Sequence, residues 1–162
     1  MAHFEKSTKK EKGAHNKQTV HVQRENGKKT TTIPNSSENK YIIWIFQDVA
    51  RDGKFAFVTE RDDMNHRDLL SKIVVYSNRT WNEVRLEKHD NGKSKHHYIG
   101  DSFDNFSKEA RDSVRKTIKD EETELIYSFR LDNLHRVIGL RIDEKFFVKW
   151  YDPRHEFYPS DP

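Results

Sequence analysis

The residue types best suited to chemistry gather near the end of the chain, in the stretch FFVKWYDPRHEFYPSDP. Asp152, Arg154, His155 and Tyr158 all lie in this stretch. An unperturbed imidazole has a pKa of about 6.5, so His155 could give or take a proton near neutral pH. The alternative is a polar loop that ends a core strand, in which Asp152 caps a turn and Pro153 fixes φ. Asp152 could also hold His155 in one tautomer.

Cations that could hold a phosphate lie on two strand-like segments, Arg130 in ELIYSFRL and Arg136 and Arg141 in RVIGLRI. When the 2′-hydroxyl of RNA attacks the neighbouring phosphate, cleavage needs a base near the hydroxyl, cations around the phosphate and an acid at the leaving oxygen. A guanidinium can grip two phosphate oxygens. The predicted catalytic residues are His155, Arg130, Arg136 and Tyr158, and the predicted substrate-binding residues are Arg141, Lys149, Trp150, His96 and His97.

An aromatic ring at Trp150 or Tyr158 could stack on a base. The plain alternative is that the arginines are ordinary solvated charges on an exposed sheet face and that Tyr158 packs under a loop. Both interpretations stay open at this level.

The stretch KSKHHYIG offers a second group of imidazoles. In an extended segment His96 and His97 point to opposite sides, so one could face a site while the other faces solvent. A pair of His residues brought together by the fold could act as acid and base, and the alternative is two solvated loop imidazoles. His89, His96, His97 and His155 lack the i, i+4 helical spacing of a strong zinc signal, and the chain has no Cys. We therefore predict no metal and no cofactor.

The elements that must position these residues are clearest in the final third of the chain. ELIYSFRL, RVIGLRI and KFFVKWYD, joined by DNLH and DE, predict an antiparallel meander of three strands. Side chains alternate between the two faces of a strand, so one face should be apolar and the other should carry Arg130, Arg136 or Arg141, depending on the register. Helices must cover the apolar face.

The segments before the meander predict a hairpin and two or three helices. KYIIWIFQDV and KFAFVTE, separated by Asp52-Gly53, predict a hairpin whose first strand lies inside the sheet. DMNHRDLLSKIVVYSN, WNEVRLEK and SFDNFSKEARDSVRKTIKD have helical periodicity. Asp63 or Asn65 could cap the first helix, and Thr80 with Glu83 has the spacing of a capping box. The prediction is a two-layer α+β fold, an antiparallel meander packed against two or three helices.

Composition divides the chain into two parts. Hydrophobic residues make up 33% of it and charged residues 35%, and its first 38 residues are rich in Lys and poor in large apolar side chains. We predict that residues 1–38 form a disordered basic tail and residues 39–162 a single α+β domain. The tail could attract phosphates or be a solvated leader. A pI near 9.0 permits contact with nucleic acid.

Hydropathy predicts a cytoplasmic protein that does not contact a membrane. No apolar run approaches the length needed to cross a bilayer. The N-terminal residues have no apolar signal core.

The order of elements, with the pattern SFRL-x4-RVIGLRI-x3-FFVKWYDPRHEFYP, resembles the RelE/ParE superfamily of small bacterial toxins over residues 40–160. Many members of that superfamily cut messenger RNA with Arg, His, Lys, Glu or Tyr residues. The resemblance implies this role for Arg130, Arg136, His155 and Tyr158. For the acidic general base it offers only Glu83 and Glu87 as candidates. The chain is also similar to uncharacterised phage and mobile-element proteins with a WYDPxHxxYP ending.

The resemblance implies an RNA-binding protein that acts as a metal-independent endoribonuclease on free or ribosome-bound RNA, with an antitoxin or another protein as partner. The alternative is a binding module for protein or DNA without catalysis, or an inhibitor of a host enzyme, of phage or mobile-element origin. That alternative needs no general base.

Overall fold

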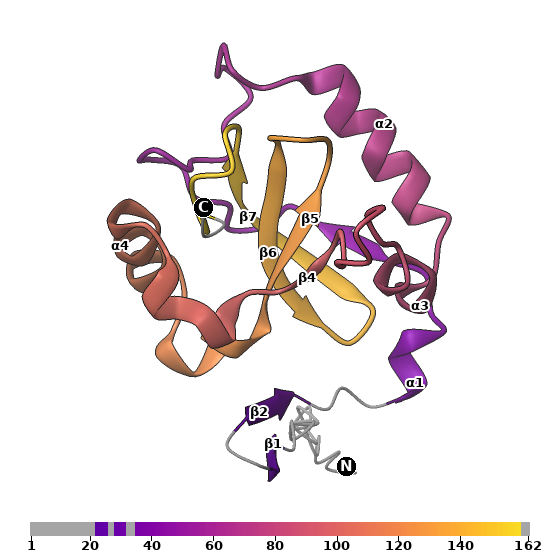
Figure 1. The fold of residues 1–162 in the computed structure, drawn as a ribbon. Helices are drawn as coiled ribbons and strands as arrows, with labels where there is room; N and C mark the ends of the chain where they lie inside the picture. Colours follow the sequence, from indigo (N-terminus) through magenta and orange to yellow (C-terminus); the bar gives the residue numbers. More distant parts are fainter. Residues whose placement is uncertain (1–21, 26–27, 32–34, 160–162) are drawn as a thin grey trace, which may run out of the picture.

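The centre of the molecule is a five-stranded sheet with the strand order β3-β7-β6-β5-β4 (Figure 1). The computed structural model describes residues 22–25, 28–31 and 35–159. The strands of this sheet are β3 (Ile43–Ile45), β4 (His97–Tyr98), β5 (Ile126–Arg130), β6 (Arg136–Ile142) and β7 (Lys145–Asp152).

The predicted meander of β5, β6 and β7 is confirmed, because β6 pairs antiparallel with both of its neighbours. The sheet as a whole is mixed, since β3 runs parallel to β7. Between β6 and β7 the ladder is irregular: Ile138 pairs with Trp150 and Gly139 with Val148, so Lys149 is an extra, bulged residue.

The helices begin where the local sequence signals place them. Asn65 caps the second helix by accepting the Asp68 N–H, and Thr80 with Glu83 forms the predicted capping box. The helical segments are α1 (Asn35–Glu38), α2 (His66–Ser77), α3 (Trp81–Arg85), η1 (Gly100–Asn105), α4 (Lys108–Thr117) and η2 (Asp120–Leu125).

Both faces of the sheet are covered, so the prediction of two layers with one open face is wrong. On the first face, which we call the α2 face, Tyr127, Phe129 and Phe146 pack in one buried cluster with residues of α2 and α3. On the opposite face, the α4 face, Ile138 and Trp150 pack in a second cluster with residues of α4. Figure 1 shows α4 on one side of the sheet and α2 with α3 on the other.

The predicted hairpin of residues 40–60 is wrong. The turn at Gly53 exists, with φ at 85°, but β3 pairs with β7 and lies at the edge of the sheet. The second half of the expected hairpin, around Phe55–Phe57, is buried irregular chain that bonds to the end of β7 through the Phe55 carbonyl and the Tyr151 N–H at 3.0 Å. Alternating apolar residues indicated burial here but not the strand partner.

Parts of the predicted basic tail have regular structure. β1 (Val22–Glu25) and β2 (Lys28–Thr31) form an antiparallel pair, and α1 follows. For residues 1–21, 26–27 and 32–34 the prediction of disorder lies outside the described residues, and the domain boundary after residue 38 stays a prediction. Among the helices of the described residues, none has the length and hydropathy needed to cross a membrane.

Candidate functional site

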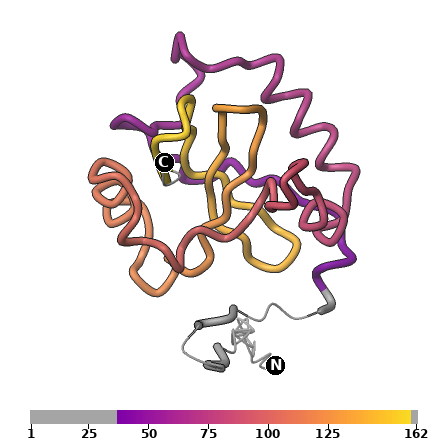
Figure 2. Tube along the Cα trace, in the orientation of Figure 1, coloured from indigo at the N-terminus to yellow at the C-terminus, as the bar shows by residue number. Residues whose placement is uncertain are grey.

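The strand register gathers charged residues at one end of the sheet. Arg130 on β5 lies opposite Arg136 on β6, which in turn lies opposite Asp152 on β7. His97 on β4 pairs with Ser128, two residues before Arg130, so its side chain shares the α4 face with both arginines. Figure 2 shows the β5–β6 turn and the C-terminal loop at this same end.

The two arginines carry positive charge that no carboxylate neutralises directly. Within the part of the chain that the structure describes, neither Arg130 nor Arg136 has an ion pair within 4.0 Å. Burial and the charge of Arg130 lower the pKa of Arg136 to about 10. Like charges directly opposite each other on a sheet destabilise it, so this pair would be stabilised by an anion.

Carbonyl groups of the β5–β6 turn hold both guanidinium groups in place. Arg130 Nε donates to the Asp132 carbonyl at 2.7 Å, and Arg136 Nη1 donates to the Asp132 and His135 carbonyls at 2.9 and 3.0 Å. Asp132 fixes the turn in return, because its carboxylate accepts the N–H groups of Leu134 and His135 at 2.8 Å each. The cations therefore have a rigid support.

Three imidazoles lie close enough to these arginines to respond to their charge. Desolvation, followed by the charge of Arg136, lowers the pKa of both His97 and His155. His97 is exposed, and the charge of His155 also lowers its pKa. Desolvation and Arg130 lower the pKa of His89, whose Nδ1 and Nε2 lie 2.8 and 2.6 Å from Arg130 Nη1.

The C-terminal loop holds His155 in an unusual backbone conformation. Its φ is 58°, in the left-handed region that His and Asn tolerate better than most residues. The buried Asp152 carboxylate supports the loop by accepting the N–H groups of Arg154, Glu156 and Phe157 at 3.2, 3.0 and 2.8 Å. Asp152 is thus the turn cap that the sequence suggested as one alternative. We call His89, His97, Arg130, Arg136 and His155 the Arg/His cluster.

Two predicted binding residues lie in packed interior positions. Arg141 is 1% exposed, stacks on Trp81 with its guanidinium carbon 4.0 Å from the ring centre, and pairs with Glu38. Trp150 is fully buried and donates its indole N–H to the Ser113 hydroxyl at 2.9 Å. The structure does not bring these side chains to the Arg/His cluster, because Arg141 faces α3 and Trp150 faces α4.

The other predicted residues also lie apart from the cluster or support it from within. Lys149 occupies the bulge, and its ammonium donates to the Asp48 carbonyl at 3.1 Å. Tyr158 packs against Phe106, with ring centres 5.8 Å apart. His96 is buried, and its Nδ1 accepts the backbone N–H of Arg130 at 3.1 Å. Of the nine predicted residues, the cluster contains His97, Arg130, Arg136 and His155.

A pocket of about 440 Å³ adjoins the cluster at the outer edge of β5. We call it the β5-edge pocket, and it contains Glu87, one of the two acids named as a candidate base. Glu87 contacts His96 at 3.4 Å and Lys95 at 3.9 Å and pairs with Arg79, whereas Glu83 is used by its capping box. The lining residues are Asp68, Ser71, Lys72, Tyr76, Glu87, His89, Lys95, Arg130, Leu131, Asp132 and Asn133.

Sequence reasoning considered His89 only as a metal ligand, although a signal for its position was present. The residues Asp90, Asn91 and Gly92 favour a turn, and residues 87–95 fold into a short loop in which the His89 N–H donates to the Lys93 carbonyl at 2.9 Å. A two-sided loop of this kind places Glu87, His89 and Lys95 near one another. Which strand edge they would meet depends on contacts far apart in the chain.

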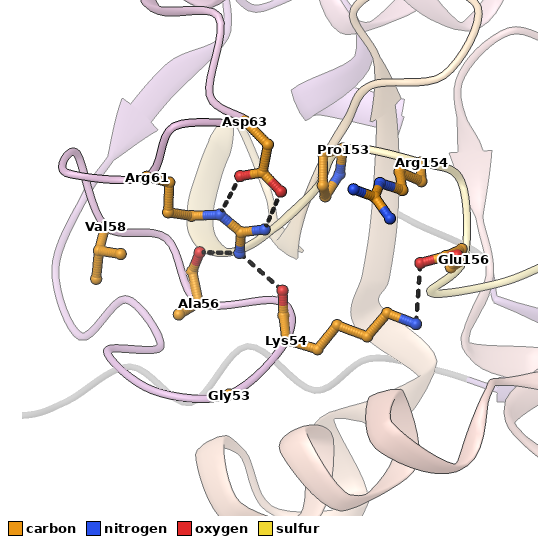
Figure 3. A pocket seen from close by; sticks show the side chains of 9 residues that line it. All are labelled: Gly53, Lys54, Ala56, Val58, Arg61, Asp63, Pro153, Arg154 and Glu156. Carbon is orange, nitrogen blue, oxygen red and sulfur yellow. Dashed lines mark hydrogen bonds and ion pairs between the residues drawn. The ribbon is translucent and has the colours of Figure 1, made fainter.

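A second pocket, of about 360 Å³, lies between residues 53–63 and the C-terminal loop, which both line it (Figure 3). Its charges are largely paired: Arg61 donates to both Asp63 oxygens at 2.7 and 2.8 Å, and Lys54 pairs with Glu156 at 2.9 Å. Figure 3 shows the Arg154 guanidinium pointing into this pocket, away from the Lys54–Glu156 pair. The Lys54–Glu156 pair attaches the loop that carries His155 to residues 53–63.

Comparison with known protein families, curated proteins and solved structures finds no match. The α+β fold with its mixed sheet is therefore described from the structure alone, and the resemblance to the RelE/ParE superfamily stays a prediction. Among the described residues, no three His, Asp or Glu side chains gather in a way that could hold a metal ion.

Proposed function

We propose that this protein binds RNA at the Arg/His cluster and cleaves it by proton transfer between its imidazoles and the RNA. The observation that carries the proposal is the cross-strand pair of Arg130 and Arg136, which has no directly paired acid and lies beside His97 and His155. A phosphodiester carries the negative charge that this pair lacks.

The proposed reaction uses the cluster's own side chains. The 2′-oxygen attacks the neighbouring phosphorus while a neutral imidazole takes its proton, and the P–O5′ bond breaks as a protonated imidazole gives a proton to the leaving oxygen. The products are a 2′,3′-cyclic phosphate and a 5′-hydroxyl. His97 is proposed as the base and His155 as the acid, with Arg130 and Arg136 on the non-bridging oxygens.

The pKa directions are compatible with these two roles. In the free protein both imidazoles have a pKa below the ordinary value, so they are mostly neutral at pH 7 and one can accept a proton. A bound phosphate brings a negative charge next to the cluster, which raises both pKa values and favours protonation of the other ring. The ligand would thus help to create the acid.

A non-catalytic RNA- or protein-binding module is the second candidate. It is favoured by the bonds from Arg130 and Arg136 to the turn carbonyls, because these bonds already give the guanidinium groups a structural role. On this alternative the cluster would bind its partner without a chemical step.

The test is incubation of the purified protein with free and ribosome-bound RNA, with and without EDTA, followed by analysis of the product ends. His155→Asn is the informative variant, because Asn also tolerates the left-handed φ of 58°. Loss of a general acid should lower the cleavage rate about 100-fold or more. His66→Asn, an exchange at an exposed residue outside the cluster at the start of α2, serves as the matched control.

Cyclic phosphate ends that appear with the wild type and with His66→Asn, but not with His155→Asn, support the proposal. RNA that is bound but left intact on both substrates favours the second candidate. The absence of both RNA binding and RNA cleavage would refute the RNA assignment.

A further inference from the structure

The β5-edge pocket adjoins the Arg/His cluster and is a concave space, whereas the cluster is a row of charged and titratable side chains. Its volume of about 440 Å³ falls within the range of small-molecule sites, roughly 300–1,000 Å³, and exceeds what a phosphate group alone would need. Buried Tyr76 and Leu131 provide apolar surface, and Arg130 belongs both to the pocket and to the cluster. A chain bound at the cluster could therefore extend into this pocket.

Charges of both signs line the pocket. The cations are Lys72, Lys95 and Arg130, and the acids are Asp68, Glu87 and Asp132. A simple anion would meet three carboxylates here, so the charge balance favours a ligand that combines a negative group with hydrogen-bond donors. A nucleotide with an amino group on its base is such a ligand.

The three acids differ in whether a carboxylate oxygen is still available to accept a hydrogen bond from a ligand. Glu87 is shared by Arg79, Lys95 and His96, and Asp132 accepts two backbone N–H groups and contacts His135. Asp68 accepts the Asn65 side-chain N–H through Oδ2 at 2.7 Å. Its Oδ1 has no hydrogen-bond partner among the described residues, so Asp68 is the acid with an oxygen available to a ligand.

The cations leave donors for a phosphate. Each terminal nitrogen of Arg130 carries two N–H groups. Nη1 lies against both ring nitrogens of His89, whereas Nη2 donates only to Asn133 among the described residues, so the second N–H of Nη2 is available. Lys72 lies one helical turn after Asp68 on α2, and its ammonium makes no hydrogen bond or ion pair with the described residues. Arg130 and Lys72 can therefore act together on one anionic group.

We propose that the β5-edge pocket binds one nucleotide of the RNA and selects a base with an exocyclic amine, cytosine over uracil. The phosphate binds Arg130 and Lys72, and the base amine donates to Asp68. Uracil presents a carbonyl oxygen where cytosine presents its amine, so it would place an acceptor against the carboxylate. This inference rests on the proposed function, because it takes the cluster's ligand to be RNA.

The experiment is titration of the wild-type protein with 3′-CMP, 3′-UMP and inorganic phosphate by calorimetry. A hydrogen bond to a charged group should make CMP bind about tenfold more tightly than UMP. Asp68→Asn should abolish this preference, and Asp62→Asn, an exposed acid outside the pocket, should leave it unchanged. Lys72→Met should weaken both nucleotides, and phosphate alone should bind more weakly than CMP.

Equal affinity for the two nucleotides, or a preference that survives Asp68→Asn, would overturn the inference. Cleavage assays on the same variants separate this result from the proposed function. RNA cleavage without any nucleotide preference refutes the pocket and leaves the cleavage proposal standing. A CMP preference that depends on Asp68, with no RNA cleavage, supports the pocket and refutes the cleavage step.

Discussion

The buried His96 should make the stability of the protein depend strongly on pH below 7. Its ring is 1% exposed and packs against Tyr76 and Phe129, with ring centres 5.0 and 5.2 Å away. Burial, followed by the charge of Lys95, lowers its pKa from 6.5 to about 3. The geometry agrees, because Nδ1 accepts the Arg130 N–H and a proton on that nitrogen would face another donor.

The sign and size of the effect follow from proton linkage. The unfolded chain takes up a proton at His96 near pH 6.5 and the folded chain only near pH 3, so acid favours unfolding as the pH falls below 6.5. Between pH 8 and pH 5 this residue alone should reduce the free energy of unfolding by about 2 kcal/mol. The unfolded-state pKa sets this figure, because the folded ring stays neutral at pH 5.

Urea unfolding at pH 8 and pH 5 measures the effect, and His96→Asn isolates it from the other titrating groups. Asn does not titrate, and its amide oxygen can take the place of Nδ1 as the acceptor for Arg130. The wild type should therefore lose about 2 kcal/mol more than His96→Asn between the two pH values. His96→Gln is the second variant, since its longer side chain leaves the Arg130 N–H unpaired and should be less stable than His96→Asn at both pH values.

Equal losses of stability for the wild type and His96→Asn would refute the reasoning. Such a result would mean that the folded protein protonates His96 as readily as the unfolded chain does, and hence that Nδ1 is not held by Arg130.

Three further substitutions test the packing by urea unfolding at pH 7. A methyl group at Gly139 would lie 2.1 Å from the backbone oxygen of Phe147, so Gly139→Ala should cost about 3 kcal/mol, and an unchanged midpoint would contradict the bulge geometry. Arg141→Met breaks the buried pair with Glu38 and should cost about 3 kcal/mol, with a smaller loss if Glu38→Gln is already present. Asp152→Asn replaces one of two accepting oxygens by a donor and should cost about 2 kcal/mol, so full stability would exclude Asp152 as the cap of the loop.

The parts of the fold that sequence could predict are those encoded over short distances. The Asn65 cap, the Thr80–Glu83 capping box and the turn at Gly92 each depend on residues a few positions apart. The meander was also predictable, because its strands follow one another through tight turns. The wrong hairpin at residues 40–60 shows the limit, since β3 takes a parallel partner about a hundred residues away.

The candidate site was predictable only in part, because it also depends on contacts between residues far apart in the chain. Alternation left open whether Arg130 shares a face with Arg136 or with Arg141, and it could not show that His97 would reach that face from β4. Nor could it show that Arg141 would be buried, because its partner Glu38 lies 103 residues earlier. Burial of a charge depends on whether a partner arrives from elsewhere in the chain, and local periodicity carries no information about that.

Arg136 and Arg141 lie on the same strand, and the contrast between them supports a role for the Arg/His cluster beyond stability. Arg141 has the surroundings of a structural charge: it is buried against Trp81 and paired with a carboxylate. Arg136 is almost as buried, at 7% exposed, yet its bonds go to neutral carbonyls. Its cross-strand neighbours are Arg130 and Asp152, and the Asp152 carboxylate accepts N–H groups of the C-terminal loop instead of pairing with Arg136. A buried cation with only a structural role is stabilised most by a paired carboxylate. A cation that binds an anionic ligand must instead keep the position of that carboxylate free for the ligand.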